Sequence, residues 1–464
     1  MKERYLNLDA LRGYAIFTMI LSGSISYGTS MPDWMFHAQV PPPNHQFNPN
    51  LPGITWVDLV FPFFIFCMGA AIPVALNKFA KKNDHKTVII TAFRRFGLLT
   101  FFALFLEHFK SNHISPSPNN LTYLLSLGGY VLLLLAFSKL GGNHNKRVQT
   151  IVNYSALAVG VVCLLFLPLN NAEGFKITTS DIIIIVLANM ALFGTLVWWV
   201  TRNNILLRIG ILPFIMAIFL GAKIPHSWNE FIYTLTPSDA IYKFYFLKYL
   251  FILIPGTISG DWLVKYKDIN PLAVKKESGF TIAVLLLFTI IVTNLCFLFT
   301  RQVTVNILLT VVLLIITRWV INTLIISHKV LIEQFFYAGA FSLLLGLSFE
   351  AYEGGIKKDF STYSYYFVTV GLAFFSFIVL SILQSFYISK PVYRFMVLTG
   401  QNPMMVYVSG SLLLLPLMHL TGIYSYWDGM NNSFLLGFLK GLLFTMAACG
   451  ITIPFTKKGM VWKS

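Results

Sequence analysis

Residues 55–77 read TWVDLVFPFFIFCMGAAIPVALN, and this stretch decides the fold of the chain. The run reaches the ~20 apolar residues that a helix needs to cross a bilayer, and its single charged residue, Asp58, lies close to its start. Thr55 and Asp58 stand three residues apart, the spacing of a capping box, in which the third helical side chain reaches back to the cap. The stretch therefore predicts a membrane-spanning helix with a polar, capped beginning.

Apolar runs of this kind recur along all 464 residues. The chain is 56% hydrophobic and 11% charged, whereas a soluble domain carries about 25% charged residues. We predict an all-α, polytopic integral membrane bundle, a single domain over 1–464 with about 12–14 transmembrane helices. The expected spans are 8–28, 55–77, 90–109, 121–139, 148–168, 181–200, 207–222 (short enough to be re-entrant), 243–264, 278–299, 303–325, 331–349, 363–388, 395–419 and 434–455.

The net charge of +16 has two explanations, nucleic-acid binding and the positive-inside rule of membrane proteins. Basic residues gather in alternate loops, whereas 423–434, a loop of the opposite parity, contains no Lys or Arg. The positive-inside rule explains this alternation, so we expect no nucleic-acid partner, both termini in the cytoplasm, and the long loops 29–54, 222–242 and 350–363 on the outer side. The clustered residues are Lys78, Lys81, Lys82, Lys86, Arg94, Arg95, Lys139, Lys146, Arg147, Lys265, Lys267, Lys275, Lys276, Lys457, Lys458 and Lys463.

The first outer loop holds the residues best suited to chemistry at the membrane surface. Its sequence from 31 to 54 is MPDWMFHAQVPPPNHQFNPNLPGI, in which three prolines stiffen the backbone between His37 and His45. Histidine exchanges protons near neutral pH, although a loop histidine is often plain solvated surface. No Cys, His or carboxylate cluster completes a metal site around the two, so we expect no metal. The cysteines all lie in apolar runs, which predicts buried thiols and no disulfide framework: Cys67, Cys163, Cys296 and Cys449.

Asp58 has two compatible interpretations. The capping box with Thr55 explains it as a structural residue. Alternatively, its carboxylate fixes the tautomer of His37, as carboxylates do for catalytic imidazoles.

Polar residues at the start of other runs also need an explanation. Asp9 and Arg12 lie one turn apart in the first run, where Asn7 is a candidate N-cap. They are either a capped helix end whose arginine reaches lipid phosphates, or a pair that presents a cation to a phosphorylated ligand. Arg94 and Arg95 open the third run on the same predicted side and are candidates for the same task.

A late apolar run is interrupted by Gly400-Gln401-Asn402-Pro403. Pro403 lacks a backbone donor, and the amide of Asn402 needs partners in an apolar setting. Broken helices at membrane depth are tolerated where they line a cavity, so we predict a helix break here and regard Asn402 as a candidate site residue.

Three motifs in order resemble the heparan-α-glucosaminide N-acetyltransferase family, a group of transmembrane acyltransferases with bacterial members. They are LDALRG at 8–13, the outer loop that ends in His37-Ala38, and GITWVDLVFPFFIFCMG at 53–69. Two weaker matches follow, KKDFSTYSYYFVTVG at 357–371 and GQNPMMVYV at 400–408. The core motifs thus fall within 1–140 and 331–464, and helix pairs near 181–222 and 278–325 look like insertions.

The resemblance implies an enzyme that moves an acetyl group from cytosolic acetyl-CoA to an amine or hydroxyl of a sugar or glycan beyond the membrane. It also implies a bacterial inner membrane with the His37 loop in the periplasm, and a homodimer is compatible with it. Carried over residue by residue, it assigns catalysis to His37, Asp58 and Asn402, and CoA binding to Asp9 and Arg12, with Arg94 and Arg95 added on charge and side.

Two mechanisms and a second class of function stay open at this point. The imidazole of His37 acts either as a general base on the acceptor or as a nucleophile that carries the acyl group. A transporter of a glycan or lipid-linked sugar is the alternative, favoured by the broken helix and the number of spans. Against it, no internal repeat is visible and few charges lie at mid-membrane depth.

Overall fold

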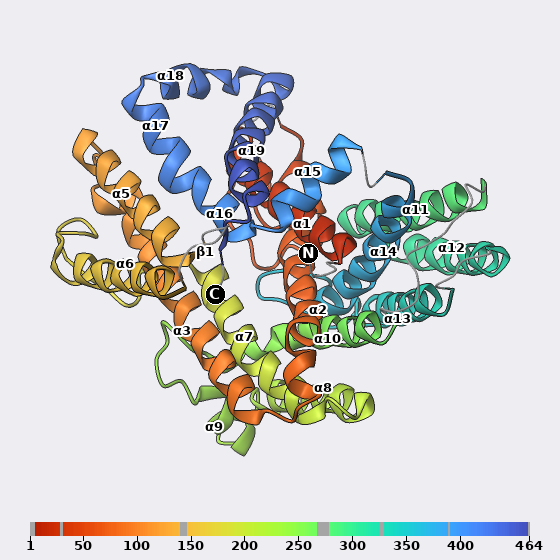
Figure 1. Ribbon diagram of the computed structural model, residues 1–464. Helices are drawn as coiled ribbons and strands as arrows, with labels where there is room; N and C mark the ends of the chain where they lie inside the picture. The colour runs from red at the N-terminus through yellow and green to blue at the C-terminus, as the bar shows by residue number, and fades with distance from the viewer. Residues whose placement is uncertain are drawn as a thin grey trace. The chain divides into compact units, whose positions relative to one another are not determined.

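The computed structural model describes residues 5–27, 31–139, 146–266, 278–324, 329–387 and 390–462 (Figure 1). Within these residues, twelve helices are long and apolar enough to cross a membrane. The chain is therefore an all-α polytopic integral membrane protein, as its composition predicts. Four members of the basic pattern lie outside the described residues: Lys267, Lys275, Lys276 and Lys463.

The chain forms two compact units, each assembled from three segments. The first comprises Met1–Asn77, Phe251–Gly400 and Asn431–Gly441, and the second comprises Lys78–Leu250, Gln401–Met430 and Leu442–Ser464. Because both units combine segments distant in sequence, no single cut of the chain separates them. The single domain over 1–464 stays a prediction.

The first unit is built mainly from long helices, and two of its loops, the one with His37 and the one with Lys358, carry the candidate site. Its elements are α1 (Leu6–Ser24), η1 (Asp33–Met35), η2 (Trp56–Leu59), α2 (Val60–Ala80), α10 (Leu250–Lys265), α11 (Ser278–Phe299), α12 (Val303–Thr323), α13 (Lys329–Ser348), α14 (Tyr363–Tyr387) and α15 (Pro391–Gly400). Helix α19 (Phe434–Lys457) contributes to both units.

The second unit adds one small two-stranded sheet to its helices. Its elements are α3 (His85–Phe109), α4 (Ser111–Ile114), α5 (Asn120–Phe137), β1 (Ser138–Lys139), α6 (Lys146–Phe166), α7 (Ile182–Thr201), α8 (Ile205–Gly221), α9 (Trp228–Thr234), η3 (Phe244–Tyr249), α16 (Pro403–Val408), the π-helical η4 (Ser409–Leu414), α17 (Leu415–Leu420), α18 (Ile423–Asp428), η5 (Gly429–Asn432) and β2 (Val461–Trp462). Strand β1 pairs with β2 in antiparallel register.

The expected spans correspond closely to these helices. Two of the fourteen are not among the twelve: the predicted short span at 207–222 is α8, and the first span is α1. The break predicted near residue 400 is confirmed, because α15 ends at Gly400 and α16 begins at Pro403. Helix pairs α7–α8 and α11–α12 occupy the two predicted insertions, whose inserted origin stays a prediction.

Glycines allow helices of the first unit to approach closely. A Cβ on Gly400 would lie 1.8 Å from the carbonyl oxygen of Asp9, and one on Gly13 would lie 1.9 Å from that of Met396. The backbones of α1 and α15 are therefore in direct contact where they cross, as is common where small residues line the contact between two membrane helices. The long helices α13 and α14 also lie side by side (Figure 1).

Two details of the sequence interpretation are wrong. Helix α1 begins at Leu6 with Tyr5 as its cap residue, so Asn7 lies inside the first turn, where its side chain donates to Ser381 Oγ at 2.9 Å. Cys67 and Cys449 are buried as expected, whereas Cys163 is partly exposed and Cys296 is exposed. Helix α11 presents apolar side chains outward around Cys296, which suits a lipid-facing surface better than a buried position.

Candidate functional site

His37 and Asp58 are brought together at the N-terminal end of the second span. His37 Nδ1 lies 2.7 Å from Asp58 Oδ1. The histidine side chain is 34% exposed, whereas that of Asp58 is 2% exposed. A buried carboxylate thus orients an imidazole that remains open to a reactant, which is the arrangement expected for a catalytic histidine.

The second oxygen of Asp58 holds the backbone around the site. Oδ2 accepts from the N–H of Thr55 at 2.9 Å and from the N–H of Ala38 at 3.3 Å, and the capping box with Thr55 is complete. The two interpretations of Asp58 are therefore compatible, because Oδ2 caps the helix and Oδ1 contacts His37. The bond to Ala38 also fixes the residue that follows the histidine.

Lys358 is a third member of the site that the sequence interpretation missed. Its Nζ lies 3.2 Å from His37 Nε2 and 3.3 Å from Nδ1. These near-equal distances place the ammonium beside the ring rather than along the lone pair of one nitrogen. The only sequence signal was its position in the 357–371 motif, which reports the residue type but not its contact with a loop more than 300 residues earlier.

Gln39 ties the two loops to each other. Its Oε1 accepts from the N–H of Asp359 at 2.8 Å, while its Nε2 donates to the carbonyl oxygen of the same residue and to that of Pro49 at 3.3 Å. The side chain is 3% exposed, so these bonds are shielded from water. This clamp on Asp359 fixes the position of the neighbouring Lys358 relative to His37.

Further bonds anchor both loops to the helices below. The hydroxyl of Tyr365, in α14, donates to the carbonyl oxygen of Asp58 at 2.9 Å. Gly53 N–H donates to the carbonyl oxygen of Ile356 at 2.7 Å, and Glu350 Oε2 accepts from Ile356 N–H at 3.2 Å. Such a network makes the site part of the rigid framework rather than a loose loop.

His45 has a different environment from His37. Its ring packs edge-on against Phe36 at 4.5 Å and against Tyr27 at 5.2 Å between centroids. Phe36, the residue before His37, thus packs on the ring of His45. No group of three metal-ligating side chains occurs among the described residues.

Asp9 and Arg12 form the predicted pair within the first unit. Arg12 Nη1 lies 3.2 Å from Asp9 Oδ1 and 3.3 Å from the carbonyl oxygen of Gly400. Gly400 is the last residue of α15, where a cation satisfies the terminal carbonyl groups and the helix dipole. The contacts present in the structure therefore explain the pair as a structural link between α1 and α15.

The remaining candidates lie in the second unit. Arg94 and Arg95 are on α3, where Arg94 is exposed and lines a cavity. Asn402 is 0% exposed, and its side-chain amide forms two hydrogen bonds with the backbone. Nδ2 donates to the carbonyl oxygen of Met460 at 3.1 Å, and Oδ1 accepts from the N–H of Trp462 at 3.1 Å. Asn402 thus holds the strand β2, and its catalytic assignment stays a prediction.

Comparison with protein families places the chain among relatives of undetermined activity. Residues 4–263, more than half of the chain, match the family described as Domain of unknown function (DUF5009). The chain belongs to the DUF5009 family. The DUF5009 match includes His37 and Asp58, whereas Lys358 lies outside it. A search of curated proteins gave no match, so the resemblance to the heparan-α-glucosaminide N-acetyltransferase family stays a prediction.

Proposed function

We propose that this DUF5009 protein is a membrane-bound acyltransferase that uses His37 to move an acetyl group from cytosolic acetyl-CoA to an amine or hydroxyl of a sugar or glycan on the outer side. The observation that carries the proposal is the 2.7 Å contact between a partly exposed imidazole and a buried carboxylate. The motifs at 8–13, 53–69 and 357–371 support the choice of reaction. A bacterial inner membrane, with the His37 loop in the periplasm, is part of the same proposal.

Asp58 prepares His37 for either of two routes. An ionised carboxylate accepts from Nδ1–H, which leaves the lone pair of Nε2 free. In the first route, Nε2 takes the proton of the acceptor as the acceptor attacks the thioester; the carbon–sulfur bond breaks, and the departing thiolate of CoA then takes that proton. In the second, the lone pair of Nε2 attacks the thioester carbonyl, the carbon–sulfur bond breaks and CoA leaves as the thiolate; the acceptor then displaces the histidine from the acyl group, and the proton that the acceptor gives up ends on that thiolate.

Lys358 supplies the positive charge that either route needs. Attack on the thioester carbonyl places negative charge on its oxygen, and a preorganised donor beside that oxygen lowers the barrier. The ammonium lies 3.2 Å from Nε2, so a carbonyl that reacts at or near Nε2 comes within its reach. Gln39 holds the loop of Lys358 in place and is a positioning residue for this charge.

The test is acyl transfer in liposomes that contain the purified chain, with radiolabelled acetyl-CoA and a panel of amino sugars. His37→Ala should abolish transfer, and His226→Ala, which removes an exposed histidine from an outer loop, should leave it unchanged. Full transfer by His37→Ala would refute the assignment. Uptake of the sugar without thioester cleavage would instead favour the transporter.

A further inference from the structure

A cavity of about 310 Å³ lies within the second unit, between α3, α5 and α6. None of the described residues that line it is acidic, and they combine one guanidinium with hydroxyl, amide and apolar groups. Such a lining suits a ligand with an anionic part and an apolar part. The lining residues are Arg94, Leu98, Ala136, Phe137, Ser138, Gln149, Thr150, Asn153, Tyr154 and Leu157.

Ser138 provides a second and independent indication of a ligand. The residue is 4% exposed, and its Oγ has no hydrogen-bond partner among the described residues. Buried hydroxyl groups are normally bonded, because an unpartnered one loses its bonds to water without replacement. An unpartnered hydroxyl in the wall of a cavity that also contains Arg94 points to an anionic group that accepts from both.

The wall around Ser138 is held rigidly by side-chain amides of α6. Asn153 Nδ2 donates to the carbonyl oxygens of Leu135 and Ala136 at 2.7 Å each. Gln149 Nε2 donates to the carbonyl oxygen of Ser138 at 3.0 Å. These bonds satisfy the last carbonyl groups of α5, which have no partner within the helix, and they fix the distance between α5 and α6 (Figure 1).

Asn402 extends this support from the other side. Its two bonds hold strand β2, and β2 pairs with β1 in a register that sets Trp462 opposite Ser138. The ring of Trp462 also stacks on Phe137, with centroids 6.0 Å apart. Asn402 therefore determines the position of two cavity residues without touching the cavity.

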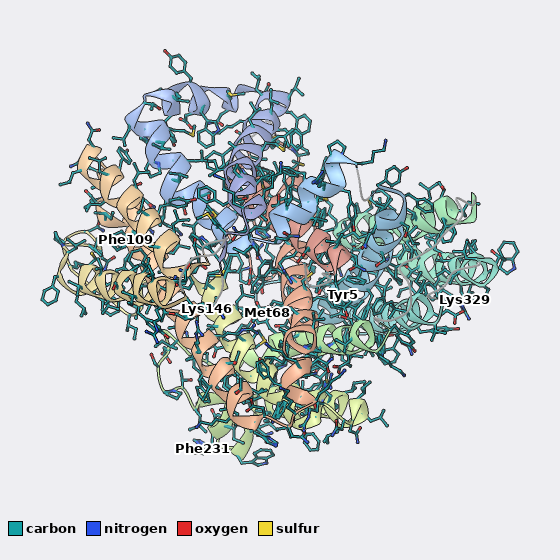
Figure 2. All side chains as sticks on the ribbon, viewed as in Figure 1. Tyr5, Met68, Phe109, Lys146, Phe231 and Lys329 are labelled. Atoms are coloured by element: carbon teal, nitrogen blue, oxygen red, sulfur yellow. The ribbon has the colours of Figure 1, made fainter. Side chains whose placement is uncertain are left out.

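The surrounding charge also favours an anion. Lys146, labelled in Figure 2, and Arg147 begin α6, and Arg95 follows Arg94 on α3. This end of the helices corresponds to the loops that the positive-inside rule assigns to the cytoplasm. A phosphorylated ligand on that side meets cations before it enters the cavity.

We propose that this cavity binds an organic phosphate, with Arg94 and Ser138 donating to the phosphate oxygens and Asn402 as the residue that positions Ser138. The nucleotide end of CoA and the headgroup of an anionic phospholipid share this chemistry. Where CoA is the source, the inference rests on the proposed function and extends its binding site to Ser138 and Asn402.

Binding measurements on the purified full chain in detergent test the inference. Equilibrium dialysis with radiolabelled CoA forms one arm, and native mass spectrometry with added phosphatidylglycerol forms the other. Arg94→Ala should weaken binding of the ligand by about tenfold or more, because a charge-assisted bond is lost. Ser138→Ala should weaken it several-fold, and Lys86→Ala, an exposed cation on the same helix outside the cavity, should not change it.

The positioning role of Asn402 has its own readout. Asn402→Ala should lower the affinity for the same ligand as Ser138→Ala does. Asn402→Asp, which keeps an acceptor for the N–H of Trp462, should recover part of that affinity. Thermal unfolding of each variant separates weaker binding from loss of the fold, and Ser138→Ala removes a single oxygen and serves as the test if the Asn402 variants do not fold.

The outcomes separate this inference from the proposed function. Weaker CoA binding identifies CoA as the ligand, and loss of bound phosphatidylglycerol with CoA binding unchanged identifies a lipid headgroup; both support the cavity. Unchanged binding of both ligands in Arg94→Ala and Ser138→Ala overturns it, even if His37→Ala abolishes acyl transfer. Conversely, full transfer by His37→Ala refutes the catalytic proposal and leaves the cavity intact.

Discussion

Replacing Asp58 with Asn is the sharpest test of the site, because an amide cannot serve both sides of this side chain. At present Oδ1 faces His37 Nδ1, and Oδ2 faces the N–H groups of Thr55 and Ala38 at 2.9 and 3.3 Å. If the Asn oxygen faced the histidine, its NH₂ group would meet two N–H donors, and both bonds would be lost. In the opposite orientation the oxygen keeps both of those bonds, and the NH₂ group faces the imidazole.

The magnitudes favour the second orientation. A hydrogen bond to a charged group contributes roughly 1.5–3 kcal/mol. Losing the bonds to both N–H groups therefore costs more than replacing the single bond to His37 by one of opposite direction. The Asn NH₂ group then donates to Nδ1 of His37, and the proton of the ring moves to Nε2. We therefore expect Asp58→Asn to lose roughly 1–3 kcal/mol of stability and to lose acyl transfer by about 10³–10⁴-fold, because Nε2 no longer has a free lone pair.

Acyl transfer and thermal unfolding, measured on the same preparation, separate the two effects. Thr55→Ala is the matched control: it removes the hydroxyl that caps Val57 N–H at 3.3 Å and donates to the carbonyl oxygen of Phe36 at 2.7 Å. It should cost roughly 1–2 kcal/mol and leave transfer within a few-fold. Transfer by Asp58→Asn within tenfold of the unchanged protein, or losses that simply follow stability in both variants, would refute the reasoning.

Three further predictions concern other parts of the chain. Lys358→Met should lower the rate of acyl transfer by about 10–10³-fold with little change in thermal stability, whereas Lys357→Met should leave the rate unchanged. Equal rates for Lys358→Met and the unchanged protein would exclude the charge of Lys358 from the mechanism. Gly400→Ala should destabilise the fold by about 3 kcal/mol or more, because its Cβ would lie 1.8 Å from a backbone oxygen of α1, while Gly23→Ala, with no atom within 4 Å, should be neutral in the same unfolding assay. Burial raises the pKa of the Asp181 carboxyl above its ordinary value. The stability that this group contributes is therefore complete below the ordinary pKa and is lost as the pH rises through the raised pKa. Asp181→Asn should gain stability relative to the unchanged protein as the pH rises from about 4 upwards, and parallel profiles of stability against pH for the two proteins would contradict this.

The site could be predicted in part because half of it is local in sequence. Thr55 and Asp58 are three residues apart, and the capping box follows from helix geometry alone. The pairing of Asp58 with His37 was one of two interpretations, and the structure shows that separate oxygens satisfy both. Lys358 could not be found in this way, since no periodicity links it to His37.

The role of Asn402 illustrates the same limit. The sequence predicted a helix break and an amide in need of partners, and both are present. What it did not reveal is that the partners belong to the last strand, Val461–Trp462, which pairs with Ser138–Lys139. Backbone partners supplied by a distant strand leave no pattern around the asparagine itself.

By itself, the sequence determined that this is a helical membrane protein and where its helices lie. The length of an apolar run and the position of charged residues are local properties, and each segment's insertion into the bilayer depends on its own run and flanking charges. Tertiary structure alone decided which polar groups meet: His37 with Lys358, Gln39 with Asp359, Arg12 with Gly400. The reason is physical, because in an apolar setting each polar group must find a partner, and which partner is within reach depends on how the helices pack rather than on the residues beside it.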